Sequence, residues 1–189
     1  MGRASKAIVL AEDQFHQRFV YRYLSCLTQF RNPTHDIRGR IAPRGRGSGE
    51  QWVREQYASE VREHRSRAVQ TALVVVIDAD TNNVDRRTQQ LRDTLAAAGL
   101  QSRTANERIV HLIPKRNIET WVVVLNGIAT DETADFTVRQ NVAASVTPLE
   151  AHIKPAANTL FDWSRPNAAP PAHCVDSLRR AIPEVRRLE

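Results

Sequence analysis

The sequence is poor in cysteine and has no long apolar run. Its 189 residues include two cysteines, Cys26 and Cys174, which form no CxxC pair and no zinc-ligand set. Such cysteines are most simply buried or free thiols of a cytoplasmic protein. No apolar segment approaches the roughly 18 residues that a membrane-spanning helix needs. The opening segment MGRASKAIVLAEDQF turns acidic and polar too early for a secretory signal, so we expect a cytoplasmic protein without a membrane partner.

Several catalytic motifs are also missing. The six histidines form no HxH and no HExxH pattern, which speaks against the common zinc-hydrolase arrangement. The glycine-rich segment at 45–49 is neither preceded by an apolar strand pattern nor followed by GK[ST], so it does not predict a nucleotide-binding P-loop. No serine or cysteine stands in a nucleophile-elbow motif.

Positive charge is concentrated in the first part of the chain. Residues 1–70 carry 13 Lys+Arg against 7 Asp+Glu, whereas residues 71–189 carry 14 of each. Five arginines fall between residues 31 and 49 together with four glycines and two prolines, a composition typical of a flexible loop. Because arginine matches phosphate oxygens, this loop predicts contact with nucleic acid. A solvated linker that only keeps the protein soluble is the alternative.

Apolar runs alternate with amphipathic segments along most of the chain. Three runs predict buried strands, at Ala7–Ala11, Ala72–Ile77 and Arg108–Ile113. Helical spacing predicts helices over 15–27, 50–67 and 84–98, the last one closed by Gly99. The composition of residues 117–125 fits either a strand or a helix, and a helix is favoured because Asn117 can cap it and Glu119 then lies in its first turn. This alternation favours an α/β sandwich around a mostly parallel central sheet flanked by helices.

The pattern weakens beyond Gly127. Residues 130–144 are polar and are expected to be partly helical, and Val175–Leu188 predicts a terminal helix interrupted at Pro183. We therefore expect a catalytic domain over residues 1–165, with the basic loop inserted at about 31–49. Residues 166–189 are expected to form a Pro/Ala linker and a C-terminal helix packed on the same domain.

Carboxylates follow the apolar segments at three places. Glu12 follows the first predicted strand, Asp78 and Asp80 follow the second, and Glu119 lies just after the third. The carboxyl ends of parallel strands lie at one edge of a sheet, where ligands bind. Gathered carboxylates repel one another unless a cation neutralises them, and oxygen ligands select Mg²⁺ or Mn²⁺.

Each of these carboxylates alone has a plainer explanation. An Asp-x-Asp after a strand is more often a turn or a helix cap than a metal site. In an extended chain the side chains of Asp78 and Asp80 would lie on one face, which suits a shared ion. The order of the three acidic positions, each after an apolar segment, is what favours metal binding.

This arrangement resembles the Toprim catalytic domain of topoisomerases, primases and OLD-type nucleases. The likeness is strongest to small stand-alone Toprim-like proteins and to the OLD-type and RloB-like nucleases of phage-defence systems. It covers residues 6–125 and extends less closely to Leu188. The segments that carry it are AIVLAE with Glu12, VVVIDAD with Asp78 and Asp80, and NIETW with Glu119.

The sequence departs from the Toprim pattern at the first motif. The family usually has Glu-Gly there, often with an acidic residue four positions after the Glu, whereas this chain has Glu12-Asp13 and His16. His16 is either a metal ligand or a solvent-facing helix residue. OLD-type nucleases also use a lysine downstream of the last acidic motif, for which Lys154 is the best-placed candidate and Lys115 the alternative.

The resemblance implies metal-assisted cleavage of phosphodiesters. Asp78 and Asp80 would hold Mg²⁺, Glu12 would act as general base or bridge to a second ion, and Glu119 would complete the coordination. Lys154 would neutralise charge on the phosphate in the transition state. The family resemblance further implies a DNA or RNA substrate, a separate ABC-type ATPase partner, a possible homodimer, and a role in anti-phage defence.

Two other functions are compatible with the same residues. A degenerate Toprim-like subunit would bind or regulate a partner ATPase without catalysis, and the Glu12-Asp13 departure favours this alternative. A response-regulator-like receiver also places acidic residues after its strands. The arginine/glycine insertion and the lack of a well-placed lysine after a strand count against the receiver.

Overall fold

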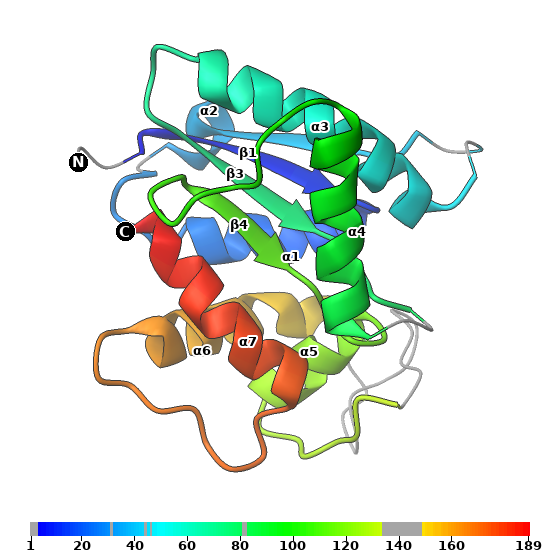
Figure 1. Cartoon of the computed structure of the whole chain (residues 1–189). Coiled ribbons are helices and arrows are strands. Elements are labelled where there is room, and N and C mark those ends of the chain that lie inside the picture. The colour runs from blue at the N-terminus through cyan, green and yellow to red at the C-terminus, as the bar shows by residue number, and fades with distance from the viewer. Residues whose placement is uncertain (1–3, 31, 44, 46, 81–82, 134–148) are drawn as a thin grey trace.

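The computed structural model describes residues 4–30, 32–43, 45, 47–80, 83–133 and 149–189. A four-stranded parallel sheet lies at its centre, with helices on both faces (Figure 1). The strands are β1 (Lys6–Ala11), β2 (Ile37–Ile41), β3 (Thr71–Val76) and β4 (Ile109–Leu112), in the order β2-β1-β3-β4. The predicted α/β sandwich with a parallel sheet is therefore confirmed, and its layers are Rossmann-like.

The helices divide between the two faces of the sheet. They are α1 (Gln14–Leu24), α2 (Pro33–Asp36), α3 (Gly49–Ser66), α4 (Val84–Ala97), α5 (Ile118–Leu125), α6 (Ile153–Ser164) and α7 (Asp176–Val185), with short 3₁₀ turns at Leu149–His152 and Arg186–Leu188. One apolar core joins α1, α5, α6 and α7 to one face, and a second joins α3 and α4 to the other (Figure 1).

The central strands β1 and β3 are buried on both faces. In β1, Val9 belongs to one core and Ile8 and Leu10 to the other, as the two-residue period of a strand requires. This double burial explains why β1 and β3 appear in the sequence as continuous apolar runs.

Side-chain caps fix the starts of several helices, of which the sequence indicated the one at Asn117. Asn117 accepts a hydrogen bond from the Thr120 backbone N–H at 3.1 Å, which confirms the predicted start of α5. Asp13 caps α1 and Asn83 caps α4 in the same way. Gly99 has φ +67° just beyond α4, where its freedom to adopt positive φ ends the helix.

The expectation of a flexible loop over residues 31–49 was wrong for its first half. Residues 33–36 form the single turn α2, and residues 37–41 form β2, an edge strand parallel to β1. Gly39 stands in this strand because α1 lies close against it: a β-carbon there would collide with the side chains of Gln17 and Tyr21. A glycine among arginines therefore marks close packing here, rather than a turn.

The C-terminal region is more regular than its sequence pattern. Helix α6 was not expected, and α7 continues through Pro183 instead of being interrupted by it. Leu178 and Ile182 of α7 lie in the same core as α1, and Trp121 Nε1 donates to Ser177 Oγ at 2.8 Å. Most of the stretch 130–144 lies outside the described residues. Among the helices that are described, none is both long and apolar enough to cross a membrane.

Candidate metal centre

The order in which strands are added to the sheet reverses between the parallel strands β1 and β3. After β1 the chain continues to β2 on one side, and after β3 it continues to β4 on the other side. The helices that follow them, α1 and α4, pack on opposite faces of the sheet. In open α/β sheets, ligands bind beyond the carboxyl ends of the strands at such a switch point. Glu12 directly follows β1, and Asp78 is the second residue after β3.

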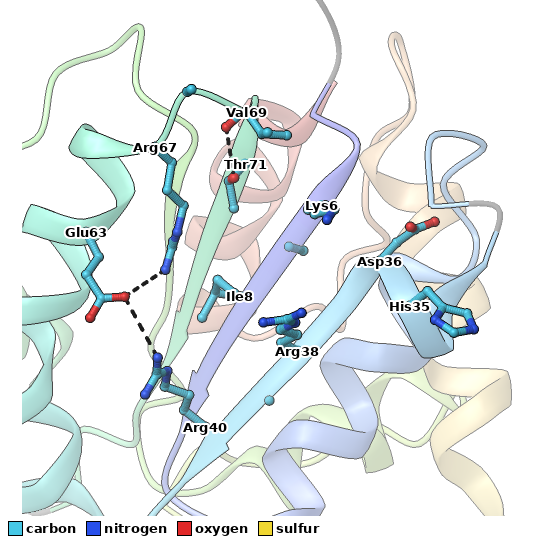
Figure 2. Close-up of a pocket in the computed structure, with 13 residues that line it drawn as sticks. Lys6, Ile8, His35, Asp36, Arg38, Arg40, Glu63, Arg67, Val69 and Thr71 are labelled. Carbon is cyan, nitrogen blue, oxygen red and sulfur yellow. Dashed lines mark hydrogen bonds and ion pairs between the residues drawn. The ribbon is translucent and has the colours of Figure 1, made fainter.

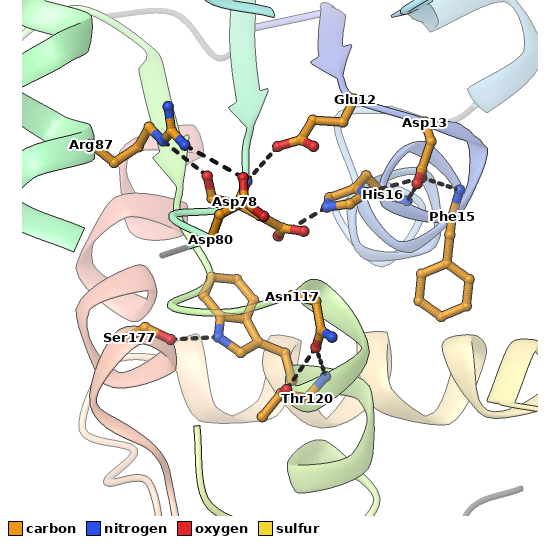
Figure 3. A network of polar contacts seen from close by, with 11 residues as sticks. Glu12, Asp13, Phe15, His16, Asp78, Asp80, Arg87, Asn117, Thr120 and Ser177 are labelled. Atoms are coloured by element: carbon orange, nitrogen blue, oxygen red, sulfur yellow. Dashed lines mark hydrogen bonds and ion pairs between the residues drawn. The ribbon is translucent and has the colours of Figure 1, made fainter. Parts of the chain in front are cut away.

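Glu12, His16 and Asp78 converge at this point (Figure 3). One possible ligand atom from each lies within 4.8 Å of the other two. The Asp78 backbone N–H donates to Glu12 Oε1 at 2.6 Å, which holds the ends of β1 and β3 together. Asp78 is buried, with 7% of its surface exposed, and His16 is buried as well. An ion needs converging ligand atoms of this kind rather than a large cavity.

The orientation of His16 is fixed by Asp13. Asp13 Oδ1 accepts from the backbone N–H groups of Phe15 and His16, and it lies 2.9 Å from His16 Nδ1. The ring proton on Nδ1 therefore points to Asp13, and Nε2 faces Asp78. A histidine that ligates a metal is oriented by a carboxylate in the same manner.

The facing atoms of His16 and Asp78 are close but poorly aligned. His16 Nε2 lies 3.0 Å from Asp78 Oδ1, yet both atoms are buried without a hydrogen-bond partner among the described residues. Two adjacent ligands at about 2.1 Å from one ion, at right angles, are about 3.0 Å apart. The spacing thus fits a shared cation as well as an ion pair.

Burial and mutual charge shift the pKa values of the cluster. Burial, with the charge of Asp78 as a smaller cause, raises the pKa of Glu12 to about 7. Burial also raises the pKa of Asp78, although His16 opposes the shift. Burial alone would lower the pKa of His16, but the charge of Asp78 and the hydrogen bond to Asp13 raise it well above its ordinary value. Without a metal, the two neighbouring carboxyl groups favour the protonated form of His16.

Glu119 lies near the cluster but is not one of its three converging groups. It stands in the first turn of α5, half-buried. Burial raises its pKa to about 7, and the charges of His16 and Asp78 act on it. The structure therefore brings the predicted Glu119 to the same edge of the sheet, and its carboxyl group is held partly protonated near neutral pH.

Asp80 does not share a face with Asp78. The strand geometry ends before it, because Asp80 has φ +53°, a left-handed conformation that aspartate tolerates. Its side chain is exposed, and its Oδ2 lies 3.6 Å from Arg87 Nη2. Its charge still raises the pKa of Glu12 and of Asp78. Asp80 is therefore close to the cluster but is oriented toward an arginine.

A buried arginine that sequence reasoning missed stands beside the carboxylates. Arg87 of α4 is 1% exposed, and its Nε donates to the Asp78 backbone carbonyl at 2.9 Å (Figure 3). Its guanidinium also pairs with Glu50, which in turn pairs with Arg54 at 2.7 Å. Arg87 thus holds the main chain of Asp78 and ties it to the start of α3.

The two lysine candidates lie apart from the converging groups. Lys154 is exposed on α6 and lines a surface hollow with Arg18, Arg22 and Glu150. Lys115 is exposed after β4, near Asp131, whose pKa is lowered mainly by hydrogen bonds from Thr133 and least by the charge of Lys115. The described contacts bring neither lysine to Glu12, His16 or Asp78.

Comparisons with known proteins found no counterpart. No model of a protein family, no curated protein and no solved structure matches the chain.

Proposed function

We propose that this chain is a metal-dependent endonuclease of the Toprim type that hydrolyses nucleic-acid phosphodiesters in the cytoplasm. The observation that carries the proposal is the buried, misaligned pair of His16 Nε2 and Asp78 Oδ1 beside Glu12, at the switch point of a parallel sheet. Desolvated groups with shifted pKa values and converging lone pairs are typical of functional sites.

The ligand set fits a hard divalent cation with some nitrogen affinity. Asp78, Glu12 and His16 would hold the ion, and Asp80 and Glu119 lie close enough to add charge. Carboxylates suit both Mg²⁺ and Mn²⁺, but imidazole favours the transition metal, so we expect Mn²⁺ to bind more tightly than Mg²⁺. Such an ion polarises the phosphate and stabilises the leaving oxygen.

The chain's own groups supply the proton transfers and the positioning. Glu119, with a pKa of about 7, is suited to accept a proton from an attacking water near neutral pH. Arg87 keeps the main chain of Asp78 in place, and Asp13 keeps His16 oriented. Lys154 lies apart from the metal centre, so it would contact a neighbouring phosphate of a strand that reaches α6, and not the scissile phosphate.

The wider assignments follow from the resemblance alone. They are a DNA or RNA substrate, a separate ABC-type ATPase partner, a possible homodimer, and a role as effector of an anti-phage defence system.

Cleavage of nucleic acid by purified protein tests the proposal. Supercoiled plasmid and, separately, total tRNA are incubated with the protein in Mg²⁺, Mn²⁺ or EDTA. Asp78→Asn should abolish the metal-dependent cleavage. Asp93→Asn, which removes an exposed carboxylate of α4, is the matched control and should leave it intact. Cleavage that survives Asp78→Asn would overturn the assigned site.

A non-catalytic Toprim-like subunit is the second candidate, and one observation favours it. A proton on His16 places one positive charge between Asp13 and Asp78 and offsets part of their negative charge, so the cluster needs a metal less. A subunit of this kind would show neither cleavage nor a rise in melting temperature with Mn²⁺. A rise with Mn²⁺ that is lost in Asp78→Asn would favour the metalloenzyme.

A further inference from the structure

The edge strand β2 turns an arginine face toward solvent. Its register with β1 places Arg38 beside Ile8 and Arg40 beside Leu10, so each pair lies on the same face of the sheet. Ile8 and Leu10 belong to the core beneath α3 and α4. Helix α3 packs on β1 and β3, and Arg38 and Arg40 are both exposed at the open edge beside it.

These arginines line the floor of a surface hollow of about 540 Å³ (Figure 2). Lys6 of β1 lies beside them, and Arg67, which follows α3, stands on the opposite wall. We call Lys6, Arg38, Arg40 and Arg67 the basic shelf. The shelf shares no residue with the candidate metal centre, so it is a separate feature of the surface.

Only half of the shelf is neutralised by carboxylates. Arg40 Nε lies 2.8 Å from Glu60 Oε1, and Arg67 Nη2 lies 2.9 Å from Glu63 Oε2. In the part of the chain that the structure describes, Lys6 and Arg38 form no ion pair. Two cations at the open side of the hollow are therefore available to an anionic ligand.

The hollow also offers apolar surface between its charges. Ile8 lies in its floor and Val69 at its rim, and Val69 is 52% exposed although it is a large apolar side chain. Neighbouring cations suit the phosphates of a strand, and the exposed Val69 offers van der Waals contact to an unstacked base. A duplex keeps its bases stacked inside, so the hollow matches an unpaired strand better.

We propose that the basic shelf binds single-stranded nucleic acid, with Lys6 and Arg38 on consecutive phosphates and a base against Val69. The choice of polymer rests on the proposed nuclease function, but the binding itself needs no metal and no cleavage. The shelf therefore holds the substrate strand at a distance from the metal centre, without reading its sequence.

Binding to labelled oligo(dT) and oligo(rU) in EDTA tests the proposal. Anisotropy is measured over a range of NaCl concentrations in the Asp78→Asn background, so that neither metal nor cleavage contributes. In the Lys6→Gln/Arg38→Gln variant the salt slope should fall by about 1.4, and the affinity near 0.1 M salt should fall about 10- to 30-fold. Val69→Ser should weaken binding without changing the slope.

The matched control is Arg62→Gln/Arg92→Gln. It removes the same charge from α3 and α4, on exposed positions away from the hollow, where Arg62 contacts the Ala98 carbonyl. An equal loss of affinity in both double variants would overturn the proposal, because binding would then follow net charge alone. Stronger binding of a DNA duplex than of oligo(dT) would also overturn it. So would a result in which Lys6→Gln/Arg38→Gln weakens binding to phosphatidylserine vesicles but leaves binding to both oligonucleotides unchanged. Shelf-dependent binding, together with no cleavage by the parent chain in Mg²⁺ or Mn²⁺, would support the shelf and contradict the proposed function.

Discussion

His16 Nε2 and Asp78 Oδ1 lie 3.0 Å apart in a buried position, and neither forms a hydrogen bond among the described residues. Either a proton on His16 Nε2 or a divalent cation can occupy the space between these two atoms, but not both at once. Competition between these two occupants gives the candidate site a dependence on pH that a surface cluster of carboxylates would lack.

Stabilisation by Mn²⁺ should increase with pH. The pKa of His16 is raised well above its ordinary value, and the pKa values of Glu12 and Glu119 are about 7, so all three groups are largely protonated at about pH 6. Metal binding must displace these protons. The rise in melting temperature with Mn²⁺ should be small near pH 6 and larger near pH 8, as measured by differential scanning fluorimetry. An equal rise at both pH values, or one that persists in Asp78→Asn, would contradict this.

Replacing Arg87 should destabilise the fold. Arg87→Met leaves the Asp78 carbonyl without its donor and removes a buried partner of Glu50, so we expect the free energy of unfolding to fall by about 3 kcal/mol. Arg86→Met, an exposed neighbour on α4, should change it by less than about 0.5 kcal/mol. Urea denaturation of both variants gives the comparison, and equal values would mean that Arg87 contributes nothing specific.

Gly49→Ala should disturb the candidate metal centre from the side of α3. A β-carbon at position 49 would lie 2.9 Å from both the Cβ and the carbonyl oxygen of Glu12, so the backbone of Glu12 must shift. We expect a loss of about 1–3 kcal/mol and a smaller Mn²⁺-induced rise in melting temperature.

Gly47→Ala is the control for that experiment. Gly47 has φ +62°, and a β-carbon there would come no closer than ordinary contact with Gln51 Oε1 at 3.8 Å, so the substitution strains the backbone without touching Glu12. It should cost about 1 kcal/mol and leave the Mn²⁺ effect unchanged. If both variants lose the Mn²⁺ effect equally, contact with Glu12 is not the cause.

His111 should make the fold less stable in mild acid. It is buried beneath Tyr57, whose hydroxyl lies 2.8 Å from His111 Nε2, and burial holds its pKa well below 6.5. Because the unfolded chain takes up the proton more readily, this contribution to stability is complete above about pH 6.5 and is lost as the pH falls below that value. His111→Gln should therefore show a shallower loss of melting temperature between about pH 7 and pH 5 than the parent chain. His35→Gln, at an exposed position, should keep the parent slope.

The sequence was sufficient to predict the elements whose residues are buried on both sides. β1, β3 and β4 stand out because burial on two faces favours apolar side chains, with His111 of β4 as an exception, and the residues that follow β1 and β3 were placed correctly at one edge of the sheet. β2 was missed because only its ends, Ile37 and Ile41, are apolar. An edge strand with a solvent-facing arginine face leaves no apolar signal.

The details of the site depend on contacts that have no sequence signature. Arg87 lies on a charged, amphipathic helix, where an arginine is ordinarily a surface residue. His16 was considered as a ligand, but its orientation depends on the Asp13 cap, which becomes visible only when the start of α1 is placed. The turn of Asp80 away from Asp78 depends on a left-handed residue after the strand, which aspartate permits but does not require.

Helix α3 touches both proposed sites at its two ends. Gly49 at its first residue abuts Glu12, and Glu63 in its last turns contacts Arg40 and Arg67 of the basic shelf. Its 18 residues form a rod of about 27 Å. A helix of this length is rigid. A strand bound at the shelf would therefore restrict the motion of α3 at Glu63 and, through Gly49 at the other end of the helix, the main chain of Glu12.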